Sequence, residues 1–208
     1  MNLRTVTRRG LGAGLTAAAL TAAALGLGAG SAHAATTAST PTPVEPLSAC
    51  SHGQFSQPLL PFKDRNFYTL APGGDFEGPT SWDLSRGASV DSDAAHGGVL
   101  DLPSGAQATS PPFCITSDYP KSRMFVRNVA GAEGVAFFVS YLRDGVWTRP
   151  KNTGQFHGDK SAWTLSGGMN IQPNGHPGWQ QARFTFVAGG TKSHFQVDDF
   201  WVDPKMRG

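Results

Sequence analysis

The stretch "GVAFFVSYLRDGVWT", from Gly134 to Thr148, decides the fold class. Its first half is rich in β-branched and aromatic residues that alternate with small or polar ones, a pattern typical of a half-buried β-strand. Asp144-Gly145 is a dipeptide favoured in tight hairpin turns, and "VWT" then resumes the strand pattern. We therefore expect two antiparallel strands joined by a tight turn.

The same pattern recurs on both sides of this hairpin. Strand-like runs occur at "RMFVRNV", "WQQARFTFVA" and "HFQVDDFWV", which are Arg123–Val129, Trp179–Ala188 and His194–Val202. Shorter runs lie between turn sequences such as "APGG" and "QPNGHPG". No window combines helical apolar spacing with capping residues. Short strands at this spacing predict an all-β fold, an antiparallel two-sheet sandwich.

The first 34 residues have the features of a secretory signal peptide. Arg4, Arg8 and Arg9 precede a weakly apolar Ala/Gly/Leu core, and "SAHA" supplies small residues before a cleavage site after Ala34. Arg8-Arg9 resembles a twin-arginine export signal, with ordinary Sec export as the alternative. We expect a secreted, extracellular protein without a membrane span in its mature form.

Two segments follow the cleavage site. Residues 35–46, "ATTASTPTPVEP", predict a flexible, disordered Thr/Pro tether. Residues 47–208 have the length of one β-sandwich domain with a single core. Removing the three signal-peptide arginines from the 17 basic residues leaves 14 against 15 acidic residues, so the mature protein is near neutral. Its basic residues are scattered, which excludes the cationic stripe of a nucleic-acid-binding protein.

The chain has two cysteines, Cys50 and Cys114, both in the part that we expect outside the cell. An even number of cysteines in an oxidising compartment favours a disulfide, which would stabilise the fold by roughly 4 kcal/mol in the loop-entropy model. A reactive thiol is the alternative. Because Cys114 lies in the apolar stretch "SPPFCI", which disfavours a thiolate, we expect the structural disulfide.

Three further stretches carry a resemblance to known proteins. They are "LAPGGDFEGPTSWDLSRGASV" (Leu70–Val90), "GGVLDLPSGAQATSPPFC" (Gly97–Cys114) and "FQVDDFWVDP" (Phe195–Pro204). Together they resemble a group of small secreted actinobacterial proteins of no established function. The first and last of them are also similar, more distantly, to jelly-roll, galactose-binding-like modules that include many carbohydrate-binding domains. The resemblance implies a jelly-roll sandwich and a glycan ligand.

The resemblance also implies a metal site. In such modules a structural Ca²⁺ commonly lies between an acidic residue of the opening strand and an Asp of the closing strand, which implies Glu77 and Asp198 as ligands, with Asp75 as a further candidate. In period two, Asp198 shares a face with Phe200 and Val202 and would point inward, where a carboxylate needs a cation with oxygen ligands. The alternative is that Asp198 accepts backbone hydrogen bonds at a β-bulge and binds no metal.

The sequence does not indicate a catalytic site. The histidines of the exported part stand at no metal-ligand spacing, and no G-x-S-x-G motif is present. Most acidic residues lie in turn sequences, for example Asp144 and Asp159, where a solvated role is ordinary. We therefore predict that the protein is not an enzyme. A hydrolase whose two carboxylates meet only in space is the remaining alternative.

Aromatic residues indicate a binding face. Trp147 follows the hairpin turn among basic residues, and Trp163 follows the polar loop "GQFHGDKSA". Aromatic rings pack on the apolar face of a sugar, and polar side chains around them meet its hydroxyl groups. We predict a module that binds a cell-wall or environmental polysaccharide, with Trp147, Trp163, Tyr141 and Arg149 at the ligand.

Two alternatives to this binding face stay open. An aromatic side chain beside a hairpin can simply cover a sheet edge. The domain can instead be a structural or protein-binding component of the cell envelope. Two or more coplanar, solvent-facing aromatic residues in a concave sheet would favour a glycan, whereas a flat apolar patch would favour a protein partner.

Overall fold

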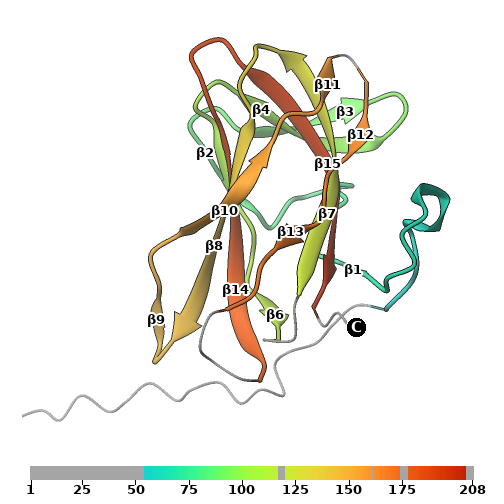
Figure 1. The fold of residues 1–208 in the computed structure, drawn as a ribbon. Coiled ribbons are helices and arrows are strands. Elements are labelled where there is room, and N and C mark those ends of the chain that lie inside the picture. Colours follow the sequence, from blue (N-terminus) through green and yellow to red (C-terminus); the bar gives the residue numbers. More distant parts are fainter. Residues whose placement is uncertain (1–53, 117–119, 161, 174–177, 205–208) are drawn as a thin grey trace, which may run out of the picture. The chain divides into compact units, whose positions relative to one another are not determined.

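The computed structural model describes residues 54–116, 120–160, 162–173 and 178–204. The predicted signal peptide, the tether and Cys50 lie outside these residues. Within them the chain forms fifteen β-strands and a single 3-10 helix, η2 (Leu60–Phe62). The strands make two sheets that pack face to face (Figure 1), so the predicted all-β, jelly-roll sandwich is confirmed.

The first sheet, which we call the seven-stranded sheet, is antiparallel throughout. Its central order is β10-β8-β14-β5-β2, with β6 paired to β14 and β9 paired to β8. The bounds of its strands are β2 (Asp83–Ser85), β5 (Gln107–Thr109), β6 (Phe113–Ile115), β8 (Val135–Arg143), β9 (Val146–Trp147), β10 (Lys151–Phe156) and β14 (Gln180–Ala188).

The second sheet, the eight-stranded sheet, has the central order β11-β7-β15-β4-β3. Strand β1 pairs with β15, and β12 and β13 pair with β7; only the β11–β7 pair is parallel among the described strands. The bounds are β1 (Thr69–Leu70), β3 (Ser89–Asp93), β4 (Gly97–Pro103), β7 (Lys121–Ala130), β11 (Asp159–Lys160), β12 (Thr164–Leu165), β13 (Met169–Asn170) and β15 (His194–Asp203).

The predicted hairpin is confirmed. Strands β8 and β9 pair antiparallel, with Leu142 opposite Trp147. Asp144 and Gly145 have φ angles of 50° and 74°, and a two-residue turn that follows the twist of its strands requires such positive angles. The hairpin therefore places Trp147 on the same sheet face as Leu142.

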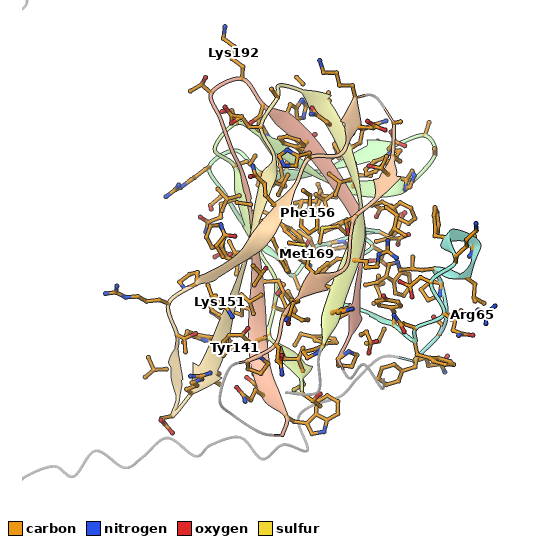
Figure 2. The ribbon with its side chains drawn as sticks, viewed as in Figure 1. Arg65, Tyr141, Lys151, Phe156, Met169 and Lys192 are labelled. Carbon is orange, nitrogen blue, oxygen red and sulfur yellow. The ribbon has the colours of Figure 1, made fainter. Side chains whose placement is uncertain are left out.

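The core fills the space between the two sheets with side chains that alternate along the long strands. Phe137 of β8 and both Phe184 and Phe186 of β14 are fully buried. Phe200 of β15 meets these three rings edge-on, with centroids 5.1 to 5.9 Å apart. Phe156 also lies between the sheets (Figure 2). Because every second residue points inward, the residues between them form the two outer faces of the sandwich.

A β-bulge in β15 overturns one expectation. The pairing of β15 with β7 changes register between Asp198 and Trp201, and Asp199 has a φ angle of 51°. Val197 and Phe200 both lie in the core, although an unbroken strand would place them on opposite faces. Asp198 therefore lies on the outer face, on the side of Gln196, and the prediction that it shares a face with Phe200 is wrong.

Residues 54–68, which we call the strap, lie against the outer side of the eight-stranded sheet next to β7 (Figure 1). The ring of Phe62 meets the ring of Phe125 edge-on at 5.4 Å. Nη1 of Arg123 lies 2.7 Å from Oδ2 of Asp64. One ring contact and one ion pair thus attach the strap to β7. In the described part of the chain no helix is long and apolar enough to cross a membrane.

Candidate ligand-binding face

The outer face of the seven-stranded sheet carries a continuous row of side chains. Since Phe137 and Val139 point into the core, Phe138 points outward between them. On the two neighbouring strands, the residues paired with Phe138 point to the same outer face. The row, which we call the Phe138 row, runs from β2 to β10 and consists of Asp83, Thr109, Thr185, Phe138 and Asn152.

The chemistry of this row is mostly neutral and polar. The hydroxyl oxygens of Thr109 and Thr185 lie 3.0 Å apart, and both side chains are half-buried. The next row along the strands consists of Ser85, Gln107, Val187, Ala136 and Gln155. The face therefore offers hydroxyl and amide groups around one half-buried aromatic ring, that of Phe138.

By strand pairing, Trp147 and Arg183 lie on the same outer face. Figure 1 shows β9 following β8 at this end of the sheet. Arg183 pairs with Ser140 across the β14–β8 ladder, and its guanidinium carbon lies 4.1 Å from the centroid of the Trp147 ring. This distance is that of a cation–π contact, which holds both side chains in place. Arg149 is exposed two residues after Trp147. The structure thus brings two of the four predicted ligand residues, Trp147 and Arg149, to this end of the sheet.

Tyr141 and Trp163 do not lie on this face. Tyr141 is 4% exposed, and its hydroxyl donates to the backbone oxygens of Ile171 and Gln172 at 3.1 and 3.2 Å. Burial raises the pKa of Tyr141 to about 12. Trp163 lies on the opposite sheet, where its ring centroid is 4.3 Å from that of His96. The prediction of one face containing all four residues is therefore wrong, because the strand alternation turns Tyr141 inward.

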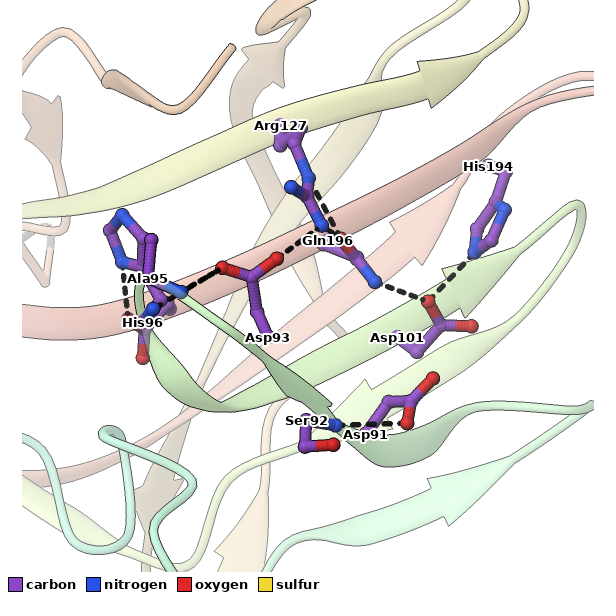
Figure 3. Close-up of polar contacts among 10 residues, drawn as sticks. Asp91, Ser92, Asp93, Ala95, His96, Asp101, Arg127, His194 and Gln196 are labelled. Atoms are coloured by element: carbon purple, nitrogen blue, oxygen red, sulfur yellow. Dashed lines mark hydrogen bonds and ion pairs between the residues drawn. The ribbon is translucent and has the colours of Figure 1, made fainter. Parts of the chain in front are cut away.

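The outer face of the eight-stranded sheet carries a polar network that sequence reasoning missed (Figure 3). Arg127 forms an ion pair with Asp93 at 2.8 Å, and its Nε donates to Oε1 of Gln196 at 2.9 Å. The Gln196 amide donates to Asp101 at 3.1 Å, and Nε2 of His194 lies 2.7 Å from the same carboxylate. These side chains, from β3, β4, β15 and β7, thus serve as one another's hydrogen-bond and ion-pair partners.

Asp198 has a partner within the protein. Its Oδ2 lies 2.8 Å from Nδ1 of His96, and its Oδ1 accepts the backbone N–H of Asp199 at 2.7 Å. Burial raises the pKa of Asp198, while the hydrogen bond with His96 acts in the opposite direction. The carboxylate that the sequence left without a partner thus has a hydrogen-bond partner, the imidazole of His96, which comes from the β3–β4 turn (Figure 3).

The other predicted calcium ligands, Asp75 and Glu77, affect the pKa of Asp199. Burial raises the pKa of Asp199, His96 lowers it, and the charges of Asp75 and Glu77 raise it again. Oε1 of Glu77 accepts the backbone N–H of Gly98 at 2.9 Å. Among the described residues, no group of three or more His, Cys, Asp or Glu side chains is arranged to hold a metal ion. Calcium binding through Glu77, Asp198 and Asp75 stays a prediction.

Cys114 lies opposite Gln181 in the β6–β14 pair and is 6% exposed. It is not a free thiol. Its predicted partner, Cys50, is outside the described residues, so the pairing of the two stays a prediction.

Comparisons with known proteins give no match in sequence and several in fold. No family model matches the sequence, and no curated protein matches it. The fold is similar to the CBM22-1 xylan-binding domain of a Paenibacillus barcinonensis protein, at 14% identity and a TM-score of 0.45 over 64% of this chain and 92% of that one. It is also similar to the family 11 carbohydrate-binding module of a cellulosomal cellulase from Clostridium thermocellum, at 14% identity and a TM-score of 0.44 over 70% and 99%.

A third solved structure of similar fold is the C-terminal CBM6 of a laminarinase from Zobellia galactanivorans. The identity is 14% and the TM-score 0.40, over 59% of this chain and 92% of that one. At these identities the likeness is one of fold, and the ligand of this chain has to be inferred from its own side chains.

Proposed function

We propose that the protein is a secreted, non-catalytic carbohydrate-binding module that binds a cell-wall or environmental polysaccharide on the outer face of the seven-stranded sheet. The observation that carries this proposal is the Phe138 row. A half-buried aromatic ring there lies between Thr185 and Asn152, in the middle of a polar sheet face.

The row has the chemistry that a glycan chain requires. A pyranose ring packs its apolar C–H side on an aromatic face, and the hydroxyl groups around it need donors and acceptors at the rim. Phe138 supplies the apolar contact, and Thr109, Thr185 and Asn152 supply the rim. Five strands spaced by about 4.8 Å span about 19 Å, so the row accommodates several sugar units.

The opposite outer face is less suited to a ligand. Arg127, Gln196 and Asp101 there are already hydrogen-bonded to one another. A ligand that broke these bonds would leave charged groups without partners, which costs free energy. The polar groups of that face stabilise the sheet.

The test compares two outward-pointing phenylalanines on central strands. Phe138→Ala should weaken retention of the mature protein on polysaccharide in affinity electrophoresis by tenfold or more, equivalent to about 1.4 kcal/mol. Phe125→Ala, the matched variant on the eight-stranded sheet, should bind as the unmodified protein does. Equal affinity of all three proteins would rule out the Phe138 row as the ligand face.

One observation favours a second function, that of a protein-binding component of the cell envelope. The strap exposes four apolar side chains to about half of their surface: Phe55, Leu60, Phe62 and Phe67. Exposed apolar groups on one short segment can mark a protein contact. Binding to isolated cell envelopes that is lost after protease treatment of the envelopes, and lost in Leu60→Ser, would support this function over the first.

A further inference from the structure

Arg183 packs its guanidinium group against a tryptophan ring. Its guanidinium carbon lies 4.1 Å from the centroid of the Trp147 ring, and the side chain is half-buried. A guanidinium that stacks on an aromatic ring uses its flat face, while its N–H donors lie in the plane and point away from the ring. The contact with Trp147 therefore fixes the group and leaves its donors available.

No carboxylate of the described residues pairs with Arg183. The half-buried arginines of β7 both have acidic partners, Arg123 with Asp64 and Arg127 with Asp93. Arg183 forms no ion pair, and its neighbour across the β14–β8 ladder is the neutral Ser140. The donors of Arg183 therefore stay open to solvent, where they can pair with an oxyanion that approaches the sheet.

Two further cations lie at the same end of the sheet. Arg149 and Lys151 are exposed, on the segment that leads from β9 into β10. Lys151 begins the edge strand β10 (Figure 2). The acidic residue of the Phe138 row, Asp83, is on β2 at the other edge of the sheet. Arg183, Arg149 and Lys151 thus outnumber Asp144, the acidic residue of the β8–β9 turn, at this end of the sheet, although the mature chain is near neutral by its composition.

Resting on the proposed function, we propose that the glycan is anionic and that Arg183 binds its oxyanions. A guanidinium matches a carboxylate or phosphate with two parallel hydrogen bonds. The sugar chain would lie along the Phe138 row with an acidic group against the Trp147–Arg183 pair, and Arg149 and Lys151 would raise the local concentration of the polyanion. A uronic acid and a phosphodiester of a wall polymer share this chemistry.

The experiment is affinity electrophoresis of the mature protein against four polymers. Polygalacturonate presents carboxylates, a poly(glycerol phosphate) teichoic acid presents phosphodiesters, and xylan and mixed-linkage β-glucan are neutral. We expect binding to one anionic polymer at least tenfold tighter than to either neutral one, with a loss of affinity between 50 and 300 mM NaCl as screening increases. The polymer that binds identifies the oxyanion.

Matched variants assign the effect to Arg183. Arg183→Gln should lower affinity for the anionic polymer at least tenfold. Arg183→Lys should lower it less, because lysine keeps the charge but lacks the planar guanidinium group that forms two parallel hydrogen bonds. Arg65→Gln, the same charge change on the exposed strap, should change affinity less than twofold. Circular dichroism shows whether each variant is folded, and the salt dependence of the unmodified protein does not rely on any variant.

The outcomes separate the two proposals. Binding to neutral and anionic polymers with equal affinity, without salt dependence and unchanged in Arg183→Gln, overturns the anionic ligand and leaves the carbohydrate-binding function standing. Binding to none of the four polymers overturns the carbohydrate-binding function and the anionic ligand together.

Discussion

Asp64 shows how a single side chain helps to attach the strap to the sheet. It accepts hydrogen bonds from Nη1 of Arg123 at 2.7 Å, the hydroxyl of Tyr68 at 2.8 Å and the backbone N–H of Asn66 at 3.0 Å. Burial acts to raise the pKa of Asp64, but the hydrogen bonds outweigh burial and lower it. The ionised carboxylate therefore stabilises the attachment of the strap.

This lowered pKa predicts the acid sensitivity of the fold. An unfolded Asp binds its proton near pH 4, above the pH at which folded Asp64 does, so stability from this group is present above about pH 4 and is lost as pH falls through the folded pKa. Asp64→Asn should lower the free energy of unfolding by about 1–2 kcal/mol at pH 7. Urea unfolding measured from pH 7 to pH 2 should show a smaller loss of unfolding free energy in the variant than in the unmodified protein. If the two plots of unfolding free energy against pH ran parallel, the role assigned to Asp64 would be contradicted.

Gly98 is a second residue whose identity the fold dictates. A Cβ atom added there would lie 2.1 Å from the backbone oxygen of Phe76. Gly98→Ala should destabilise the protein by about 1–3 kcal/mol, because backbone has to move to relieve the overlap. Gly167→Ala is the matched control, since nothing lies within 4 Å of its added Cβ. Thermal unfolding of both variants measures the difference, and equal midpoints would mean that the backbone moves without cost.

At the scale of elements, the bulge in β15 decides which acidic groups meet. The apolar core residues of this strand stand at 195, 197, 200 and 202, so two residues lie between the middle two. An unbroken strand cannot place both on one face, so the sequence does contain a signal of the bulge. The prediction from strict period-two alternation did not include the bulge and therefore placed Asp198 on the inner face. The partner of Asp198, His96, is 102 residues away in the chain, and no local pattern predicts that contact.

The bulge also sets the test for calcium. It places Asp199 within reach of the charges of Asp75 and Glu77, which a divalent cation would neutralise. If Ca²⁺ binds the folded state, millimolar Ca²⁺ should raise the thermal midpoint relative to excess EDTA, and Asp199→Asn should abolish the rise.

Asp91→Asn, an exposed carboxylate on β3, is the control and should keep the rise produced by Ca²⁺. The absence of any shift with Ca²⁺ would mean that the protein itself compensates these carboxylates.

At the scale of the whole domain, the two outer faces differ in how their polar groups are used. On the outer face of the eight-stranded sheet, Arg127, Gln196 and Asp101 hydrogen-bond to one another. On the other face, Arg183 packs on Trp147 and forms no ion pair with any described residue. Hydrophobic alternation predicted the sandwich because burial of every second residue is a local pattern. The proposed ligand face was predicted only in part. Strand order sets which side chains become neighbours, and strand order depends on pairings between distant segments.

Phe138 illustrates this limit. Two adjacent phenylalanines in a strand must point to opposite faces, so "FF" at 137–138 already indicates one outward ring. Its polar neighbours Thr109, Thr185 and Asn152 come from three other strands. Only the folded sheet shows that they form one row.

The most direct test of the ligand face is a map of the binding site on the mature protein. Amide chemical shifts of ¹⁵N-labelled protein are followed during titration with a soluble oligosaccharide of the polysaccharide that it retains. We predict shifts that cluster on β5, β8 and β14 around Thr109, Phe138, Arg183 and Thr185. Shifts that cluster instead on β4, β7 and β15, around Asp101, Arg127 and Gln196, would contradict the assignment of the ligand to the seven-stranded sheet.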